Sequence, residues 1–214
     1  MINKSKITER KHSYFNNKWF ARWAPYYDLF DLFISKLRLE AARTIDLPPG
    51  SKILDVASGT GSQAVALAKE NYDVIGIDLS PEMLNQAKKK TSPNLSLKFQ
   101  VLDATRLPFK PKSFDGVSIS LGLHDMPPTI GLEVLNEIKR VTKKGGKILI
   151  VDHLEPAIHW VAKLAHPFIR AGETPNYIPF VNVGLERILQ NSGLEISQSK
   201  YWRGLFQIVV VINP

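Results

Sequence analysis

The sequence predicts an α/β fold: a doubly wound, mostly parallel sheet of seven strands with a C-terminal antiparallel hairpin. Three observations lead to this prediction. Short aliphatic runs alternate with helix-like segments from residue 53 to residue 152. The first run, ILDVASGTG, stops at a glycine turn and leads directly into a helix-like segment. Two apolar runs flank Arg203-Gly204, which predicts a hairpin whose last strand lies antiparallel inside the sheet.

The individual elements are expected in alternation. β-branched and aliphatic runs bounded by turn residues indicate strands, whereas apolar residues three and four positions apart indicate helices. Ser80 followed by Pro81 indicates a helix start, because serine caps a helix and proline fits its first turn. The strands expected before the hairpin are 53–57, 73–78, 96–102, 114–121 and 146–152. The expected helices are 62–70, 81–90, 130–142 and 181–191.

The N-terminal part lies outside this alternation. Residues 1–14 are polar and basic, and we expect a flexible tail. Residues 15–46 carry many aromatic side chains at helical spacing, with a break at Pro25. Two helices are expected there, either as a flank of the core or as a lid over a ligand, and the two interpretations are compatible. Residues 15–214 are expected to form a single domain.

A second departure covers residues 154–191, which we expect to form an insertion on the substrate side. It begins with a helix-like part rich in histidine and aromatic residues, continues with a loop at 172–179 and ends in the helix at 181–191. The apolar spacing of the first part suits a helix packed on the fold. Alternatively, it forms an amphipathic surface that contacts a lipid acceptor or a membrane surface, with Trp160 and Lys163 at the interface.

Composition narrows the class of protein. The 214 residues, 44% hydrophobic and 22% charged, are ordinary for a globular domain. The absence of cysteine excludes disulfides, thiolate zinc sites and a cysteine nucleophile. The net charge of +8 is compatible with an anionic partner, but many lysines lie near expected helix ends and loops, so a nucleic-acid partner is not expected. The sequence shows no membrane-spanning run and no signal peptide, which predicts a cytoplasmic protein.

The glycine turn is a candidate ligand site that fits two classes of cofactor. Gly59 and Gly61 allow a ligand to approach the backbone, and amides at the start of the next helix favour an anionic group. GTGSQA fits the dinucleotide pattern G-x-G-x-x-A. In that pattern, however, the first glycine directly follows the strand, whereas here Asp55 ends the strand four residues before Gly59. A carboxylate at this position could hold a cationic or hydrogen-bond-donating ligand.

Carboxylates also end the next two expected strands. Asp78 lies 19 residues beyond Gly59, where a carboxylate can accept hydrogen bonds from both ribose hydroxyls; Ser80 can cap the following helix and leave Asp78 free. Leu79 and Met83 would flank an adenine ring, although apolar residues here are often simply core. Asp103, together with the backbone at Ala104, could bind the amino group of adenine.

Taken together, several segments resemble class I S-adenosylmethionine (SAM) methyltransferases, in particular the ubiquinone and menaquinone C-methyltransferases and related small-molecule and lipid enzymes. The matching segments, which cover nearly the whole chain, are RWAPYYDLF at 22–30, LDVASGTG, GIDLSPEML, DATRLPF, SFD and KRVTKKGGK. The resemblance implies a Rossmann-like fold, SAM as methyl donor and S-adenosylhomocysteine as product.

The resemblance also assigns individual residues. It implies that Asp55, Gly59, Thr60 and Gly61 hold the methionine end of SAM. Asp78 would bind the ribose, Asp103 would bind the adenine, and Tyr27 would close over the methionine moiety. Ala57, where the family often has glycine, and Ser120 complete the set of expected cofactor residues.

One departure from the family concerns the acceptor. His124-Asp125 stands where the quinone enzymes carry Arg-Asn, which indicates a different acceptor. His124 is a candidate general base because its ordinary pKa is about 6.5. Asp125 could orient it or could cap the turn before the following prolines, and His124 could equally be a structural histidine bonded to a loop carbonyl.

The predicted function is transfer of a methyl group from SAM to a small acceptor that is apolar or amphipathic. A non-catalytic SAM-binding protein remains an alternative, as does an NAD(P)-dependent oxidoreductase, for which 214 residues leave no second nucleotide-binding half. Asp152, His153 and Glu155 are of metal-ligand type, but their spacing matches no familiar site, so no metal is predicted.

Overall fold

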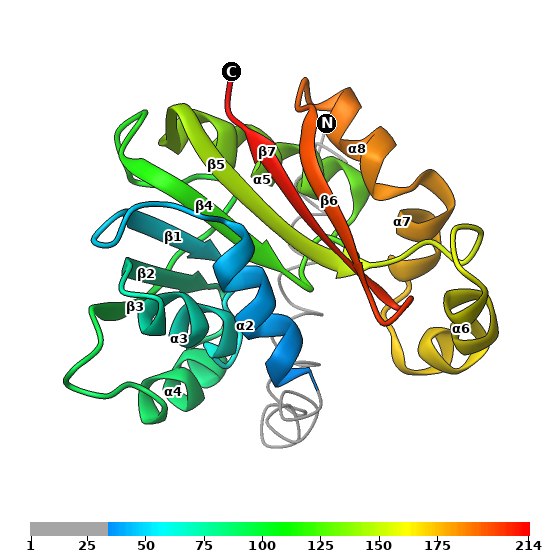
Figure 1. Ribbon diagram of the computed structural model, residues 1–214, viewed down its shortest axis with the longest axis horizontal. Coiled ribbons are helices and arrows are strands. Elements are labelled where there is room, and N and C mark those ends of the chain that lie inside the picture. The colour runs from blue at the N-terminus through cyan, green and yellow to red at the C-terminus, as the bar shows by residue number, and fades with distance from the viewer. Residues whose placement is uncertain (1–33) are drawn as a thin grey trace, which may run out of the picture.

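A computed structural model describes residues 34–214, which form one seven-stranded sheet in the order β3-β2-β1-β4-β5-β7-β6 (Figure 1). The first five strands pair in parallel, and β7 lies antiparallel between β5 and β6. This arrangement confirms the predicted fold class and the terminal hairpin. The strands are β1 (Lys52–Val56), β2 (Asp73–Asp78), β3 (Leu97–Val101), β4 (Phe114–Ser120), β5 (Thr142–His153), β6 (Ile196–Trp202) and β7 (Phe206–Ile212).

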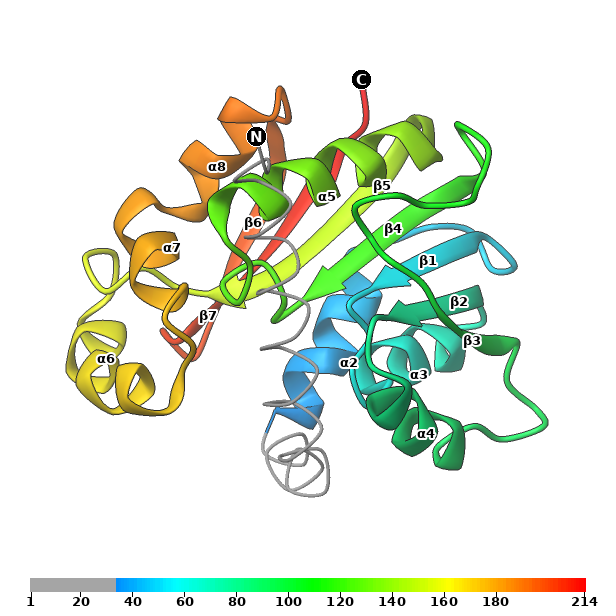
Figure 2. The same cartoon turned by 180° about the vertical axis from the view of Figure 1, so that it is seen from behind.

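Helices cover both faces of the sheet, as a doubly wound fold requires. One buried cluster joins α2 and α3 to the sheet, and a second joins α5, α7 and α8 to its opposite face. Figures 1 and 2 show these two layers from the two sides. The helices are α2 (Ser35–Thr44), α3 (Ser62–Lys69), α4 (Pro81–Lys89), α5 (Pro128–Val141), α6 (Trp160–Gly172), α7 (Tyr177–Val183) and α8 (Leu185–Asn191).

The segment between β5 and β6 differs from its prediction in two places. The expected loop at 172–179 already contains the start of α7, and the expected helix at 181–191 is broken. The break lies at Gly184, whose φ of +83° ends α7 and cannot continue a right-handed helix. The sequence signal for a helix was therefore correct, but the glycine divides it.

The predicted lid at 15–46 is described only in part. α2 lies within it, whereas Tyr27 and the tail at 1–14 fall outside the described residues. Within residues 34–214, no helix combines the length and the apolar character that a membrane span needs.

Candidate functional site

The glycine turn follows β1 and leads into α3. Gly61 has a φ of +80°, and a Cβ at this position would lie 2.6 Å from Phe99 Cζ and 2.7 Å from Ala87 Cβ. Both the backbone conformation and the close approach of α4 and β3 therefore require glycine. Gly61 directly precedes Ser62, the first residue of α3, so the unpaired amides of the first helical turn border the glycine turn.

Asp55 is a buried carboxylate next to this turn. The residue is 1% exposed, and Ser58 Oγ donates a hydrogen bond of 2.7 Å to its Oδ2. Within residues 34–214 no hydrogen bond of acceptable geometry reaches Oδ1, although the nearby Ser118 hydroxyl also lowers the pKa of this carboxyl. Burial raises the pKa of Asp55 to about 6, although the hydrogen bond from Ser58 lowers it. A buried carboxylate oxygen without a donor favours a ligand that is cationic or donates a hydrogen bond.

Asp78 is tied to the same turn from the end of β2. Gly59 N donates a hydrogen bond of 2.8 Å to Oδ2, and Ser80 N donates one of 2.9 Å to Oδ1. Burial raises the pKa of Asp78 although these backbone hydrogen bonds lower it. The cap of α4 comes from Ser80 Oγ, which accepts from Met83 N at 3.2 Å. Asp78 is thus not needed as the cap, and each of its oxygens has a further lone pair for a ligand.

Met83 and Asp103 are the next two predicted residues. Met83 Cε would be 3.5 Å from a Cβ on Gly59, so the thioether borders the turn. Asp78 pairs with Val101 in the β2–β3 register, two residues before Asp103. Asp103 is exposed, and its Oδ1 accepts hydrogen bonds from the backbone and side chain of the residue two positions on, at 2.8 and 2.7 Å.

Two further predicted residues make contacts within the protein. Thr60 Oγ1 accepts a hydrogen bond of 3.0 Å from Lys90 Nζ. Ser120 Oγ, at the end of β4, accepts a hydrogen bond from Arg38 of α2. A cationic side chain therefore stands next to the carboxyl end of β4, and its charge lowers the pKa of the neighbouring Asp55, although burial dominates.

A second group of charged side chains surrounds His124, which follows β4. Its Nδ1 lies 2.6 Å from Asp152 Oδ1, and its Nε2 lies 3.3 Å from Glu173 Oε2 and 3.5 Å from Asp125 Oδ2. His153 Nε2 lies 3.2 Å from the other oxygen of Glu173. The two imidazole centroids are 4.7 Å apart. We refer to His124, His153 and Glu173 as the histidine cluster.

The electrostatics of this cluster are set by its carboxylates. Burial alone lowers the pKa of His124, but the charges of Asp152 and Asp125 outweigh it and hold that pKa well above 6.5. Burial likewise raises the pKa of Glu173, yet its hydrogen bonds to His124 and His153 hold it well below 4.5. This arrangement favours the protonated form of His124, which can accept another group's proton only after losing one.

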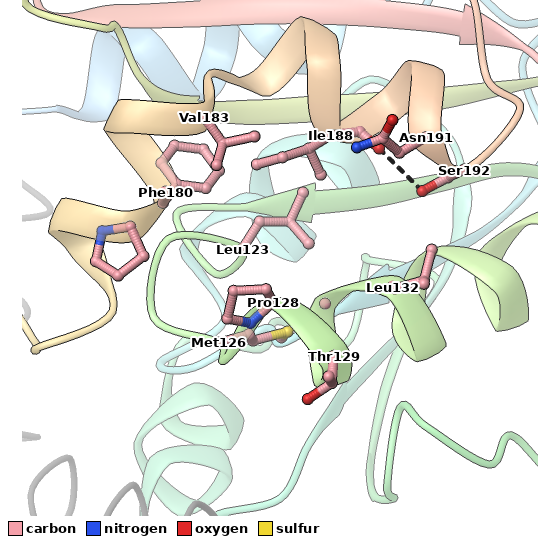
Figure 3. A pocket seen from close by; sticks show the side chains of 12 residues that line it. Leu123, Met126, Pro128, Thr129, Leu132, Phe180, Val183, Ile188, Asn191 and Ser192 are labelled. Carbon is pink, nitrogen blue, oxygen red and sulfur yellow. Dashed lines mark hydrogen bonds between the residues drawn. The ribbon is translucent and has the colours of Figure 1, made fainter.

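An apolar cavity of about 340 Å³ adjoins the histidine cluster (Figure 3). Leu123, Phe180 and Ile188 point into it from the loop after β4, from α7 and from α8. The Phe180 ring centroid lies 6.2 Å from that of His124, so one side chain borders both features. A cavity of this size suits a small organic ligand.

The acidic residues near His124 have different partners from those expected from the sequence. Asp152 holds His124 at Nδ1, whereas Asp125 lies on the side of Nε2. Glu155 accepts hydrogen bonds from the backbone amide of Leu185 at 2.6 Å and from a glutamine side chain at 3.2 Å, so it fixes the start of α8. Glu173 was not among the site residues predicted from the sequence. The sequence indicated it only as an acidic residue in the loop expected at 172–179.

Comparison with known proteins adds to this picture. Residues 53–146 match the model of a family described as a methyltransferase domain. The chain is 40% identical over 108 residues to a demethylmenaquinone methyltransferase of Beutenbergia cavernae, which covers 50% of this chain and 43% of the relative. It is 35% identical over 149 residues to one of Bacillus cereus, which covers 65% and 62%.

Among solved structures, a SAM-dependent methyltransferase from Aquifex aeolicus has a TM-score of 0.64 at 22% identity, over 84% of this chain and 93% of that one. This likeness shows the shared fold. The two curated relatives are matched over 43% and 62% of their own length. The matches confirm the resemblance predicted from the sequence.

Proposed function

We propose that this chain, whose residues 53–146 match the model of a methyltransferase domain, transfers a methyl group from SAM to a small acceptor that is apolar or amphipathic. The observation that carries the proposal is the joining of two strand-end carboxylates by one glycine turn. Asp55 is held by Ser58 and Asp78 by Gly59 N, which places acidic groups on both sides of a backbone that a ligand can approach closely.

The residues fit SAM in chemical terms. Asp55 keeps a buried oxygen without a donor from residues 34–214, which suits the cationic methionine end, and Asp78 suits the ribose hydroxyls. Asp103 suits the adenine amino group. The full set that we assign to SAM is Tyr27, Asp55, Ala57, Gly59, Thr60, Gly61, Asp78, Leu79, Met83, Asp103, Ala104 and Ser120.

The acceptor's apolar part is assigned to the cavity beside Leu123 and Phe180. SAM supplies a methyl group that is already activated on a sulfonium, so the protein has to align the acceptor and exclude water. We assign proton removal to His124, oriented by Asp152 at Nδ1, with Asp125 beside its other nitrogen. Because the carboxylates hold His124 protonated, this role predicts that transfer becomes faster as pH rises through the raised pKa of His124.

The test is incubation of the purified chain with methyl-labelled SAM and a cell extract, followed by separation into lipid, small-molecule, RNA and protein fractions. Label is expected in the lipid or small-molecule fraction, and heat-inactivated protein is the control. Label in RNA or protein would contradict the proposed acceptor. SAM binding without labelling of any fraction would favour the non-catalytic alternative.

A surface on α6 supports a lipid or membrane contact for the same function. Trp160, Leu164 and Phe168 are 69%, 66% and 82% exposed and recur every four residues, so they form one apolar stripe. Ala162 is the one buried residue of this helix. Residues 156–172 contain Lys163 and Arg170 but no acidic residue, which complements an anionic membrane surface. α6 lies at an outer end of the molecule (Figure 1).

Replacing Trp160 and Phe168 together with alanine is expected to weaken binding to vesicles containing anionic lipid at least tenfold, because each large apolar side chain contributes about 1.5–3 kcal/mol when fully buried. Co-sedimentation with vesicles measures the effect. Tyr201→Ala is the matched control, since Tyr201 is 49% exposed on β6. Equal binding of the double variant and the unchanged protein would contradict the membrane contact.

A further inference from the structure

The histidine cluster has the donor atoms of a metal site. His124 follows β4, His153 ends β5, and Glu173 directly follows α6, so three separate parts of the chain converge. One ligand atom from each residue lies within 4.8 Å of the others. Two imidazoles and one carboxylate form a donor set that divalent first-row transition metals bind in proteins.

Two of the distances between donor atoms are those expected for ligands of one ion, although they involve different oxygens of Glu173. Glu173 Oε2 lies 3.3 Å from His124 Nε2, and Oε1 lies 3.2 Å from His153 Nε2. Ligands about 2.1 Å from one metal are about 3.0–3.4 Å apart at octahedral or tetrahedral angles. Asp125 Oδ2, 3.5 Å from His124 Nε2, lies where a fourth donor could bind.

Asp152 supplies the outer partner that metal-binding histidines usually have. Its Oδ1 lies 2.6 Å from His124 Nδ1 and also accepts from His153 N at 2.8 Å. A neutral His124 that donates from Nδ1 to this carboxylate directs the lone pair of Nε2 toward Glu173. Asp152 is itself fully buried, which fixes the orientation of the ring.

The charge balance also favours a cation. Three carboxylates, those of Asp125, Asp152 and Glu173, surround two imidazoles, and a buried set of this kind needs positive charge among its members. Protons on both histidines could supply that charge through hydrogen bonds to Glu173. A single divalent ion bound between the histidines and Glu173 would replace both protons and supply the same positive charge.

We propose that His124 Nε2, His153 Nε2 and the Glu173 carboxylate bind a divalent first-row transition metal ion of the Zn²⁺ class, with Asp125 beside it and Asp152 as the outer partner of His124. The ion takes the lone pair of His124 Nε2, so metal binding would replace the assignment of proton removal to His124 and would leave methyl transfer from SAM as proposed. Phe180 lies between the cluster and the apolar cavity, so the ion would be close to the assigned acceptor site. The position of the ion near the acceptor rests on the proposed function, whereas binding of the metal ion does not.

The test is calorimetric titration of the full chain, first treated with a chelator, with Zn²⁺ at neutral pH. One equivalent is expected to bind, and Co²⁺ in its place is expected to give visible absorption bands of a site with nitrogen and oxygen ligands. Glu173→Gln keeps the side-chain size and should weaken binding at least hundredfold. Asp152→Asn should weaken it about tenfold or more, because it removes the outer partner of one ligand.

His166→Gln is the matched control, because His166 lies on α6 and contacts Tyr177 Oη at 3.2 Å without belonging to the cluster. It should bind Zn²⁺ like the unchanged protein. The proposal is overturned if the unchanged protein takes up no Zn²⁺, or if Glu173→Gln binds it equally well. Binding of SAM and methyl transfer are measured separately, so a protein that methylates without binding metal would remove this inference and leave the proposed function standing.

Discussion

Replacing Asp78 with alanine is expected to weaken SAM binding at least a hundredfold, measured by calorimetric titration at neutral pH. The variant loses the carboxylate assigned to both ribose hydroxyls. Hydrogen bonds to a charged group contribute about 1.5–3 kcal/mol each, so two of them correspond to about 3 kcal/mol or more, and 1.4 kcal/mol is tenfold. S-adenosylhomocysteine should show the same loss, because the ribose is common to both ligands.

The control has to separate ligand binding from the structure of the turn, because Asp78 also accepts hydrogen bonds from Gly59 N and Ser80 N. Ser80→Ala disturbs the same turn by removing the cap of α4, but it removes no group assigned to SAM. It should cost about 1 kcal/mol of stability and leave SAM affinity nearly unchanged. Equal SAM affinity in Asp78→Ala and the unchanged protein would remove the ribose assignment.

The convergence of Asp55, Asp78 and Asp103 could be predicted because its signals are local. Each carboxylate lies near the carboxyl end of a strand, and neighbouring parallel strands bring these ends to one edge of a sheet. β2 pairs in parallel with both β1 and β3. The hydrogen-bond partners of each carboxylate cannot be predicted from the spacing of residues in the sequence. For Asp55, one oxygen has no hydrogen-bond donor within residues 34–214.

Glu173 could not be placed in the same way. It meets His124 and His153 only because the connection after α6 returns across the ends of β4 and β5. It stands 49 and 20 positions after these two residues, and no helical or strand period links such positions. Its neighbours depend on how α6 and α7 pack, which is a property of the whole fold.

α6 illustrates a related limit. Its apolar period predicted a helix, and the helix is there, but the period does not tell which neighbour its apolar side meets. Trp160, Leu164 and Phe168 face outward, and Ala162 is its buried residue. The expected packing on the fold is made by the other side of the helix, where Ala162 is buried and Ile169 packs against the core. The exposed stripe has the character of a contact surface.

Replacing Asp55 with asparagine is expected to stabilise the fold at neutral pH while weakening SAM binding at least tenfold. Burial raises the pKa of Asp55 from 3.8 to about 6, so the folded state binds a proton more tightly than the unfolded chain. The stability that this carboxyl contributes is therefore fully present below pH 3.8 and is lost as pH rises through about 6. At neutral pH the ionised group costs up to about 3 kcal/mol.

The pH dependence makes this prediction specific. Urea unfolding should show a clearly larger stabilisation by Asp55→Asn at pH 7.5 than at pH 5, because the unchanged protein gives up its bound proton between these values. Asp115→Asn is the matched control in the same sheet. A hydrogen bond from Lys143 lowers the pKa of Asp115, so this variant should lose stability at neutral pH.

If the buried carboxylate of Asp55 serves ligand binding, Asp55→Asn should raise the stability of the fold and lower its affinity for SAM. A cationic methionine end beside Oδ1 would supply the charge that burial denies this group, so SAM should also bind less tightly to the unchanged protein as pH falls below about 6. A variant that is less stable and binds SAM as well as the unchanged protein would contradict the assignment, because Asp55 would then serve the fold and not the methyl donor.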